Sequence, residues 1–129
     1  MEQDITIYLV KANESLQTAE SEFANGRYNS CANRCYYACF QAAIAALLAE
    51  GIRARGQWSH EFVHGQFVGV LLNQRHLYDR ELRRTLSDNQ NLRDKADYRP
   101  ELVTATQASR ALRRTRTFVA AIRQRGGVA

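Results

Sequence analysis

Apolar residues recur at alternating steps of four and three near the beginning of the chain. They stand at Ile5, Leu9, Ala12, Leu16, Ala19 and Phe23. This period is that of an amphipathic α-helix, and the opposite face of this one is acidic. Asn25-Gly26 is typical of a helix end. The sequence therefore predicts a first helix over residues 3–24.

Residues 28–50 form a second predicted helix, which is rich in alanine and apolar on most of its sides. A helix of this kind belongs in the middle of a bundle. It nevertheless carries Arg34, Tyr37 and Gln41 at spacings of three and four. Burying an arginine costs several kcal/mol unless it is paired, so this polar stripe is a candidate site.

Three more helices follow. Ser59 can cap the third, and a break at residues 73–79 separates it from the fourth. The fourth must end near Tyr98, because Pro100 cannot continue a helix. Thr104 can cap the fifth helix, which has one apolar face and one arginine-rich face.

No long segment shows the alternation of a strand, and no internal repeat is present. The prediction is an all-α fold, a single-domain up-and-down bundle of about five helices. We place this helical domain at residues 1–125 and expect a frayed tail at residues 126–129.

The charge of the chain is unevenly distributed. The net charge of the 129 residues is +5, but residues 1–26 hold one lysine and five acidic residues and carry −4, which leaves +9 for the rest. Nearly all of that positive charge is arginine, whose planar fork suits bidentate contacts with phosphate or carboxylate. The pattern favours an anionic partner.

Location is predicted from two features. The chain has no uncharged apolar run of about 18 residues and no basic N-terminal leader, so we expect no membrane association. Cys31, Cys35 and Cys39 are odd in number and four residues apart, which indicates reduced core thiols rather than disulfides. A cytoplasmic protein is expected.

Several kinds of active site lack their motifs. The sequence has no glycine-rich phosphate loop, no HExxH, no GxSxG and no paired-cysteine ribbon, so we predict no cofactor and no metal. His60 and His64 lie four residues apart but have no evident third ligand. They are interpreted first as residues that are solvated at, or cap, a helix start; the alternatives are a catalytic or phosphate-contacting role, for which His60 is the candidate taken forward, and, least favoured, metal binding.

A second polar cluster lies at the end of the fourth predicted helix, where Arg93, Asp97, Tyr98 and Arg99 crowd together. Arg93 and Asp97 are four residues apart, and a surface salt bridge between them is the simplest interpretation. Together with the polar stripe of the second helix, however, two arginines with nearby tyrosines can hold a phosphodiester.

These residues resemble the HEPN superfamily, in a prokaryotic branch marked by sequences of the type GRYxxAxxRAYYAxFHAAxALL, then Thr/Ser-His, then LRxxADY. The corresponding segments here are Gly26-Arg27-Tyr28, residues 33–43, Ser59-His60 and residues 92–98. The match follows nearly the whole chain in order. The resemblance implies a bundle of about five helices that forms a homodimer with a shared cleft.

The resemblance also implies a function. Active members of the superfamily are metal-independent endoribonucleases, often toxins encoded beside a minimal nucleotidyltransferase antitoxin, and their signature is an arginine followed after four to six residues by a histidine. In some relatives a tyrosine beside that signature is adenylylated by the partner. Carried over by motif, Arg93 and Tyr98 are the candidate catalytic residues. The candidate contacts to RNA or another anion are Arg34, Tyr37, Gln41, Asp97, Arg99 and His60.

This sequence departs from the signature, because no histidine follows Arg93 within the window and Gln41 stands where the branch often has a histidine. Two interpretations stay open. The first is a toxin-like partner of a nucleotidyltransferase that cleaves or binds RNA through an arginine-lined cleft. The second is a non-catalytic module that binds a nucleotide or RNA, or scaffolds a partner.

Overall fold

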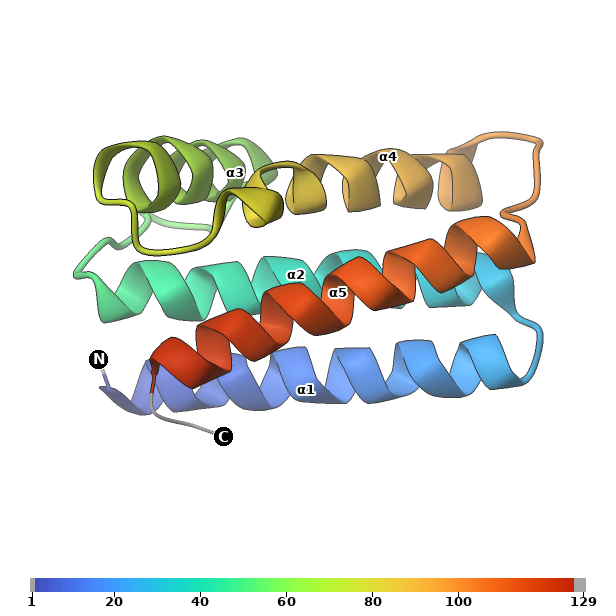
Figure 1. Ribbon diagram of the computed structural model, residues 1–129, viewed down its shortest axis with the longest axis horizontal. Helices are drawn as coiled ribbons and strands as arrows, with labels where there is room; N and C mark the ends of the chain where they lie inside the picture. Colours follow the sequence, from blue (N-terminus) through green and yellow to red (C-terminus); the bar gives the residue numbers. More distant parts are fainter. Residues whose placement is uncertain (1, 127–129) are drawn as a thin grey trace.

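The computed structural model describes residues 2–126, and within this range it contains helices and no strand. The five α-helices are α1 (Glu2–Ala24), α2 (Tyr28–Ala49), α3 (His60–Gln66), α4 (Thr85–Tyr98) and α5 (Ala105–Arg125), as Figure 1 shows. The predicted all-α bundle is confirmed. Of the predicted frayed tail, residues 127–129 lie outside the described part of the chain.

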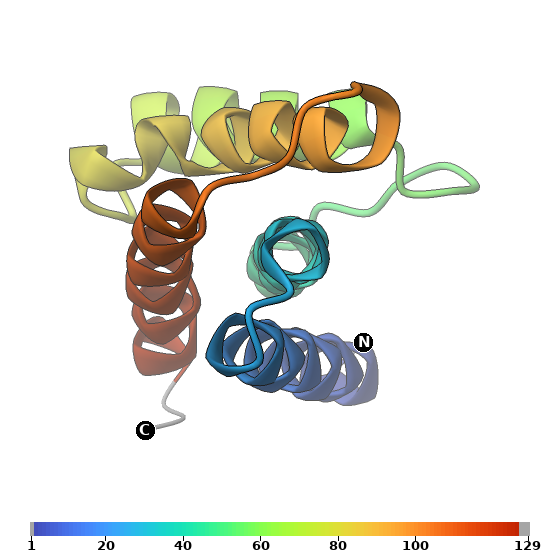
Figure 2. The same cartoon turned by 90° about the vertical axis from the view of Figure 1, so that its right-hand side faces the viewer.

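Helix α2 is the central element of the bundle. In Figures 1 and 2, α1 lies antiparallel along one side of α2, α3 and α4 cross its other side, and α5 covers a flank. Residues 42–48 of α2 are each at most 2% exposed. Most of them are alanines, whose small side chains let the neighbouring helices approach closely on several sides.

The helix starts and turns form where the sequence predicts them. The Ser59 hydroxyl accepts a hydrogen bond from the backbone N–H of Phe62 at 3.0 Å. Thr104 and Gln107 form a reciprocal capping box at the start of α5. Gly26, with φ of +74°, turns the chain between α1 and α2 through a left-handed conformation that other residues rarely adopt.

Two segments differ from the predicted regular helices. Helix α3 continues as a π-helix, η1 (Phe67–Gln74), in which the N–H of Arg75 reaches the carbonyl of Val70 at 2.9 Å. The wider turn lets Phe67, Leu71 and Leu72 all face the core. The fourth predicted helix begins as a 3₁₀ turn, η2 (Arg80–Arg84), before α4 starts.

A buried polar network joins α4 to α5. Asn89 is fully buried, and its amide nitrogen donates to the hydroxyl of Thr115 at 2.9 Å. Its amide oxygen accepts from Nε of Arg114 at 2.6 Å. Because each partner is satisfied, the network fixes the two helices against one another rather than destabilising the core.

The cysteines and the helix lengths agree with the sequence-based expectations. Cys31, Cys35 and Cys39 are free and buried in the core. Among residues 2–126, no helix combines the length and apolar character needed to cross a membrane.

Candidate functional site

The first part of the site is a hydrogen-bonded group of one tyrosine and two histidines. Tyr36 comes from the middle of α2 and is fully buried. Its hydroxyl lies 2.5 Å from Nδ1 of His60 and 2.9 Å from Nε2 of His64. The two imidazoles reach the same hydroxyl because α3 begins at His60, so the spacing of four residues places both on one helical face.

Arg93 of α4 forms the second part. Its side chain is only 11% exposed, and its guanidinium carbon lies 5.3 Å from the ring centroid of Tyr36 and 5.6 Å from that of Tyr37. Nη1 donates to the Tyr37 hydroxyl at 3.0 Å. Nε is buried and has no hydrogen-bond partner within the described residues. We call these five residues the Arg93 cluster: Tyr36, Tyr37, His60, His64 and Arg93.

Carboxylates and amides at the edge of the Arg93 cluster join α4 to α2. Arg93 lies 3.6 Å from a carboxylate oxygen of Asp94 and 3.6 Å from one of Asp97. Asp97 also accepts from the amide of Asn33 at 3.0 Å, and Asn33 accepts from Arg34 at 2.8 Å. The predicted pair of Arg93 and Asp97 is therefore present, but its arginine is buried rather than on the surface.

The surroundings keep all three members of the hydrogen-bonded group neutral. Burial raises the pKa of Tyr36, and the nearby Arg93 charge only partly opposes this. Burial lowers the pKa of His60, as does the positive charge of Arg93, while Asp94 acts in the opposite direction. Burial and the neighbouring His60 lower the pKa of His64 to about 4. Both imidazoles are therefore uncharged at neutral pH.

The structure brings most of the predicted residues together. Tyr37, Arg93 and His60 lie in the cluster itself, and Arg34 packs over the Tyr37 ring at 5.2 Å from its centroid. Tyr98 lies at the edge, where its ring centroid is 5.7 Å from the guanidinium carbon of Arg93 and its side chain points mostly into solvent.

Gln41 does not join the Arg93 cluster. With its amide oriented so that both ends are satisfied, the nitrogen donates to the carbonyl of Lys11 at 3.0 Å, to the hydroxyl of Ser15 at 2.8 Å and to the backbone carbonyl of Tyr37, one turn earlier, at 3.1 Å. It therefore ties α2 to α1. Gln41 follows Tyr37 by four residues, so the two side chains lie on a shared face of α2. The helix that packs against Gln41, however, is α1.

Arg99 also points elsewhere. It is exposed, its guanidinium lies 3.4 Å from the carbonyl of Asn91, and it lines a hollow between α4 and α5. Arg99 follows Arg93 by six residues, and at 3.6 residues per turn this places it on a different side of the chain axis.

Sequence reasoning missed the roles of Tyr36 and His64. The available signal was the pair of histidines four residues apart at a helix start, together with a tyrosine on an otherwise apolar helix that must bury its hydroxyl with a partner. Within residues 2–126, no group of three potential metal ligands is present.

Two comparisons bear on this arrangement. The family model described as HEPN domain matches residues 5–125. A protein of Methanocaldococcus jannaschii that carries the name "Putative toxin" is 28% identical over 122 residues, which cover 95% of this chain and 88% of that protein.

Proposed function

This chain belongs to the HEPN family, and on that premise we propose that it is a toxin-like protein that cleaves RNA at the Arg93 cluster without a metal. The observation that carries the proposal is a nearly buried arginine beside an uncharged imidazole, His60. The family's histidine is missing after Arg93, and His60 supplies the imidazole from another helix. The relative that carries a toxin name supports a toxin-like role.

The hydrogen bonds of Tyr36 select the tautomer of His60 that catalysis needs. His64 is uncharged, because its pKa is about 4. We assign its Nε2 as the acceptor of the Tyr36 hydroxyl proton, at 2.9 Å. The Tyr36 oxygen then accepts from Nδ1–H of His60. This leaves Nε2 of His60 without a proton, so it can act as a general base.

The reaction is transfer of the phosphate to the neighbouring 2′-oxygen. Nε2 of His60 takes the proton of the 2′-hydroxyl, and the 2′-oxygen forms a bond to phosphorus. The bond from phosphorus to the 5′-oxygen breaks, and that oxygen takes a proton from water. The imidazolium of His60 then gives its proton to the resulting hydroxide, which restores the neutral base. Arg93 stabilises the additional negative charge, and the products are a 2′,3′-cyclic phosphate and a 5′-hydroxyl.

A second candidate function is a non-catalytic module that binds RNA or a nucleotide, or scaffolds a partner. One observation favours it: the Arg93 guanidinium lies 3.6 Å from both Asp94 and Asp97, and these carboxylates compete with a phosphate for the same charge. In this function Arg93 holds the helices together, while Arg34 and its neighbours contact the ligand.

The partners follow from the toxin-like function. The antitoxin is a minimal nucleotidyltransferase, and its target is Tyr98, which is 74% exposed beside Arg93. The Tyr98 oxygen attacks the α-phosphorus of ATP and pyrophosphate leaves, which places a nucleotide over the Arg93 cluster. Leu102 is also 74% exposed, and the second copy of a homodimer with a shared cleft covers it while Tyr98 stays accessible to the antitoxin.

The test is cleavage of labelled single-stranded RNA in the presence of a chelator. We expect His60→Gln and Arg93→Gln each to lower the cleavage rate by about 100-fold or more, since each removes a group that acts in the transition state. The controls are His76→Gln and Arg84→Gln, which change the same residue types at exposed positions outside the cluster.

The outcomes separate the two functions. Cleavage that needs His60 and Arg93, together with growth arrest on expression that both variants relieve, supports the toxin-like ribonuclease. Intact RNA that is bound by the wild type but not by Arg34→Gln supports the binding module. Cleavage that all four variants retain would exclude the Arg93 cluster as the active site.

A further inference from the structure

A second basic region lies between α4 and α5. Two adjoining hollows of about 290 and 310 Å³ open there and share Arg110 and Arg114 in their walls. Together they form a continuous groove, which we call the α4–α5 groove. The cationic side chains that line it are Lys95, Arg99, Arg110, Arg113 and Arg114.

The positive charge of the groove is largely unneutralised. Its carboxylates are Glu81 and Asp88, and Asp88 already lies 3.9 Å from Arg84. Within residues 2–126, neither Arg110 nor Arg113 forms an ion pair. Elsewhere the acidic residues of α1 neutralise other arginines, as Glu20 does for Arg116.

Three arginines of α5 line the groove within about one helical turn. Arg113 and Arg114 follow Arg110 by three and four residues, which places their Cβ atoms about 5 to 6 Å from that of Arg110, one helical turn away. Arg114 is also anchored, because its Nε donates to the buried Asn89. This turn of α5 therefore presents three cations close together, one of which is held in a fixed position.

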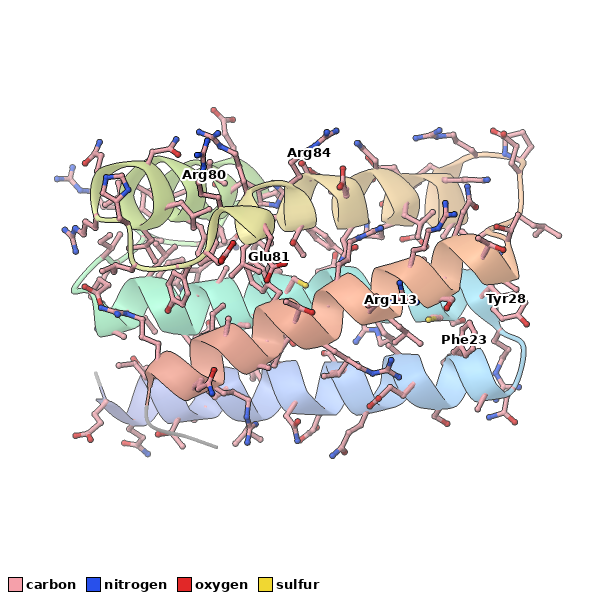
Figure 3. All side chains as sticks on the ribbon, viewed as in Figure 1. Phe23, Tyr28, Arg80, Glu81, Arg84 and Arg113 are labelled. Carbon is pink, nitrogen blue, oxygen red and sulfur yellow. The ribbon has the colours of Figure 1, made fainter. Side chains whose placement is uncertain are left out.

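Figure 3 shows that labelled side chains of η2 point to two different sides, one toward α5 and one toward the outer surface. Glu81 points from η2 toward α5, on which Arg113 lies, whereas Arg80 and Arg84 point away on the outer side. Arg80 is therefore an exposed arginine of the same chain that does not line the groove.

The lining chemistry fits a polyanion. No aromatic residue lines either hollow, so the groove offers no platform on which a nucleotide base could stack. The only large apolar side chains there are Leu82 and Leu92, whereas protein interfaces depend on a buried core of aromatic and apolar anchors. A row of cations without such anchors suits a chain of phosphates.

We propose that the α4–α5 groove binds the phosphate backbone of single-stranded RNA independently of base sequence, outside the Arg93 cluster. This inference rests on the proposed function, because it takes the RNA substrate from there. The groove holds the flanking strand, while the reaction takes place at the Arg93 cluster on the other side of α4.

The test is the salt dependence of binding, measured by fluorescence anisotropy with a labelled 20-nucleotide RNA. For the double variant Arg110→Gln/Arg113→Gln we expect a several-fold loss of affinity at low salt. The slope of log affinity against log salt should also become shallower by about 1.4, since each lost phosphate contact removes about 0.7 for a single strand. The matched control is Arg55→Gln/Arg80→Gln, which removes the same charge outside the groove and should keep nearly the wild-type slope.

Binding rather than cleavage is the readout, so the groove is tested even if the wild type cleaves nothing. If the wild type does cleave RNA, the groove variant should lose more activity on a long RNA than on a dinucleotide, because a dinucleotide has no flanking strand for the groove to hold. Equal slopes for the wild type and the groove variant would overturn the proposal and favour an acidic protein as the occupant. Equal losses in the groove variant and the control would overturn it too, because net charge alone would then explain the binding.

Discussion

Helix α4 separates two arginine-containing regions that differ in their surroundings. Arg93 faces α2 and α3, is 11% exposed, and is held by the rings of Tyr36 and Tyr37. Arg110 and Arg113 face the α4–α5 groove, are exposed, and form no ion pair among residues 2–126. An arginine side chain is thus held in one orientation in the first region and is exposed to solvent in the second.

This difference in exposure and orientation determines the chemistry to which each region is suited. A desolvated guanidinium with fixed orientation acts strongly on charge that develops at one point, which is the requirement of catalysis. Exposed cations act weakly, are screened by salt, and tolerate many ligand geometries, which is the requirement of backbone binding. Geometry should therefore dominate at Arg93, and charge alone should dominate in the groove.

The largest expected effect comes from replacing arginine by lysine in each region. Arg93→Lys keeps the charge but loses the planar group that bonds Tyr37 and packs on two rings, so we expect RNA cleavage to fall by about 100-fold or more. Arg110→Lys keeps the positive charge that attracts phosphate in the groove, so it should leave RNA affinity close to that of the wild type. Cleavage rates and binding isotherms of the two variants check this, and equal effects of the two substitutions would refute the contrast.

The fold was predictable because its signals are local. The apolar period of residues 3–24, the Ser59 and Thr104 caps and the stop before Pro100 each act within a few residues. The π-helical segment after Gln66 was not predictable, since it arises from the way Phe67 and the leucines beyond it reach the core. That is a property of tertiary packing, which a helical period does not encode.

The sequence predicted which residue types form the candidate site, but it did not predict all of the particular residues that meet there. Arg93 and Tyr37 were identified from their motifs, and the structure joins them by a hydrogen bond of 3.0 Å. Gln41 was grouped with them by its helical spacing from Tyr37, and Arg99 by its place at the end of the same helix as Arg93, but each lies against a different neighbour. Tyr36 was missed because its hydroxyl meets the two histidines only when α3 packs across α2.

A smaller effect is expected at Asn89, the buried residue that holds Arg114 in the wall of the groove. Asn89→Ala removes the partner of Arg114 Nε and one hydrogen bond of the buried Thr115 hydroxyl, which should lower the free energy of unfolding by about 1 to 3 kcal/mol. Urea denaturation checks this value. Asn91→Ala, an exposed change on the same helix, is the control and should stay close to the wild type. A loss as small as that of the control would mean that Arg114 is not anchored through Asn89.

A further expected effect is a dependence of stability on pH that arises in the Arg93 cluster. His64 has a pKa of about 4 in the folded protein and about 6.5 when unfolded. Its contribution to stability is fully present above pH 6.5. As the pH falls from 6.5 toward 4, the unfolded chain binds the proton first, so this contribution is lost. The melting temperature should therefore drop between pH 7 and pH 5.

The variant His64→Gln isolates that contribution, because the glutamine oxygen can still accept from Tyr36 but does not titrate. Its melting temperature should fall less than that of the wild type over the same pH interval. His60 also has a lowered pKa and shifts stability in the same direction, so part of the dependence should remain. His76→Gln, at an exposed position, should keep the wild-type dependence. A pH dependence that His64→Gln leaves unchanged would mean that His64 is not held uncharged against Tyr36, and the tautomer assigned to His60 would lose its support.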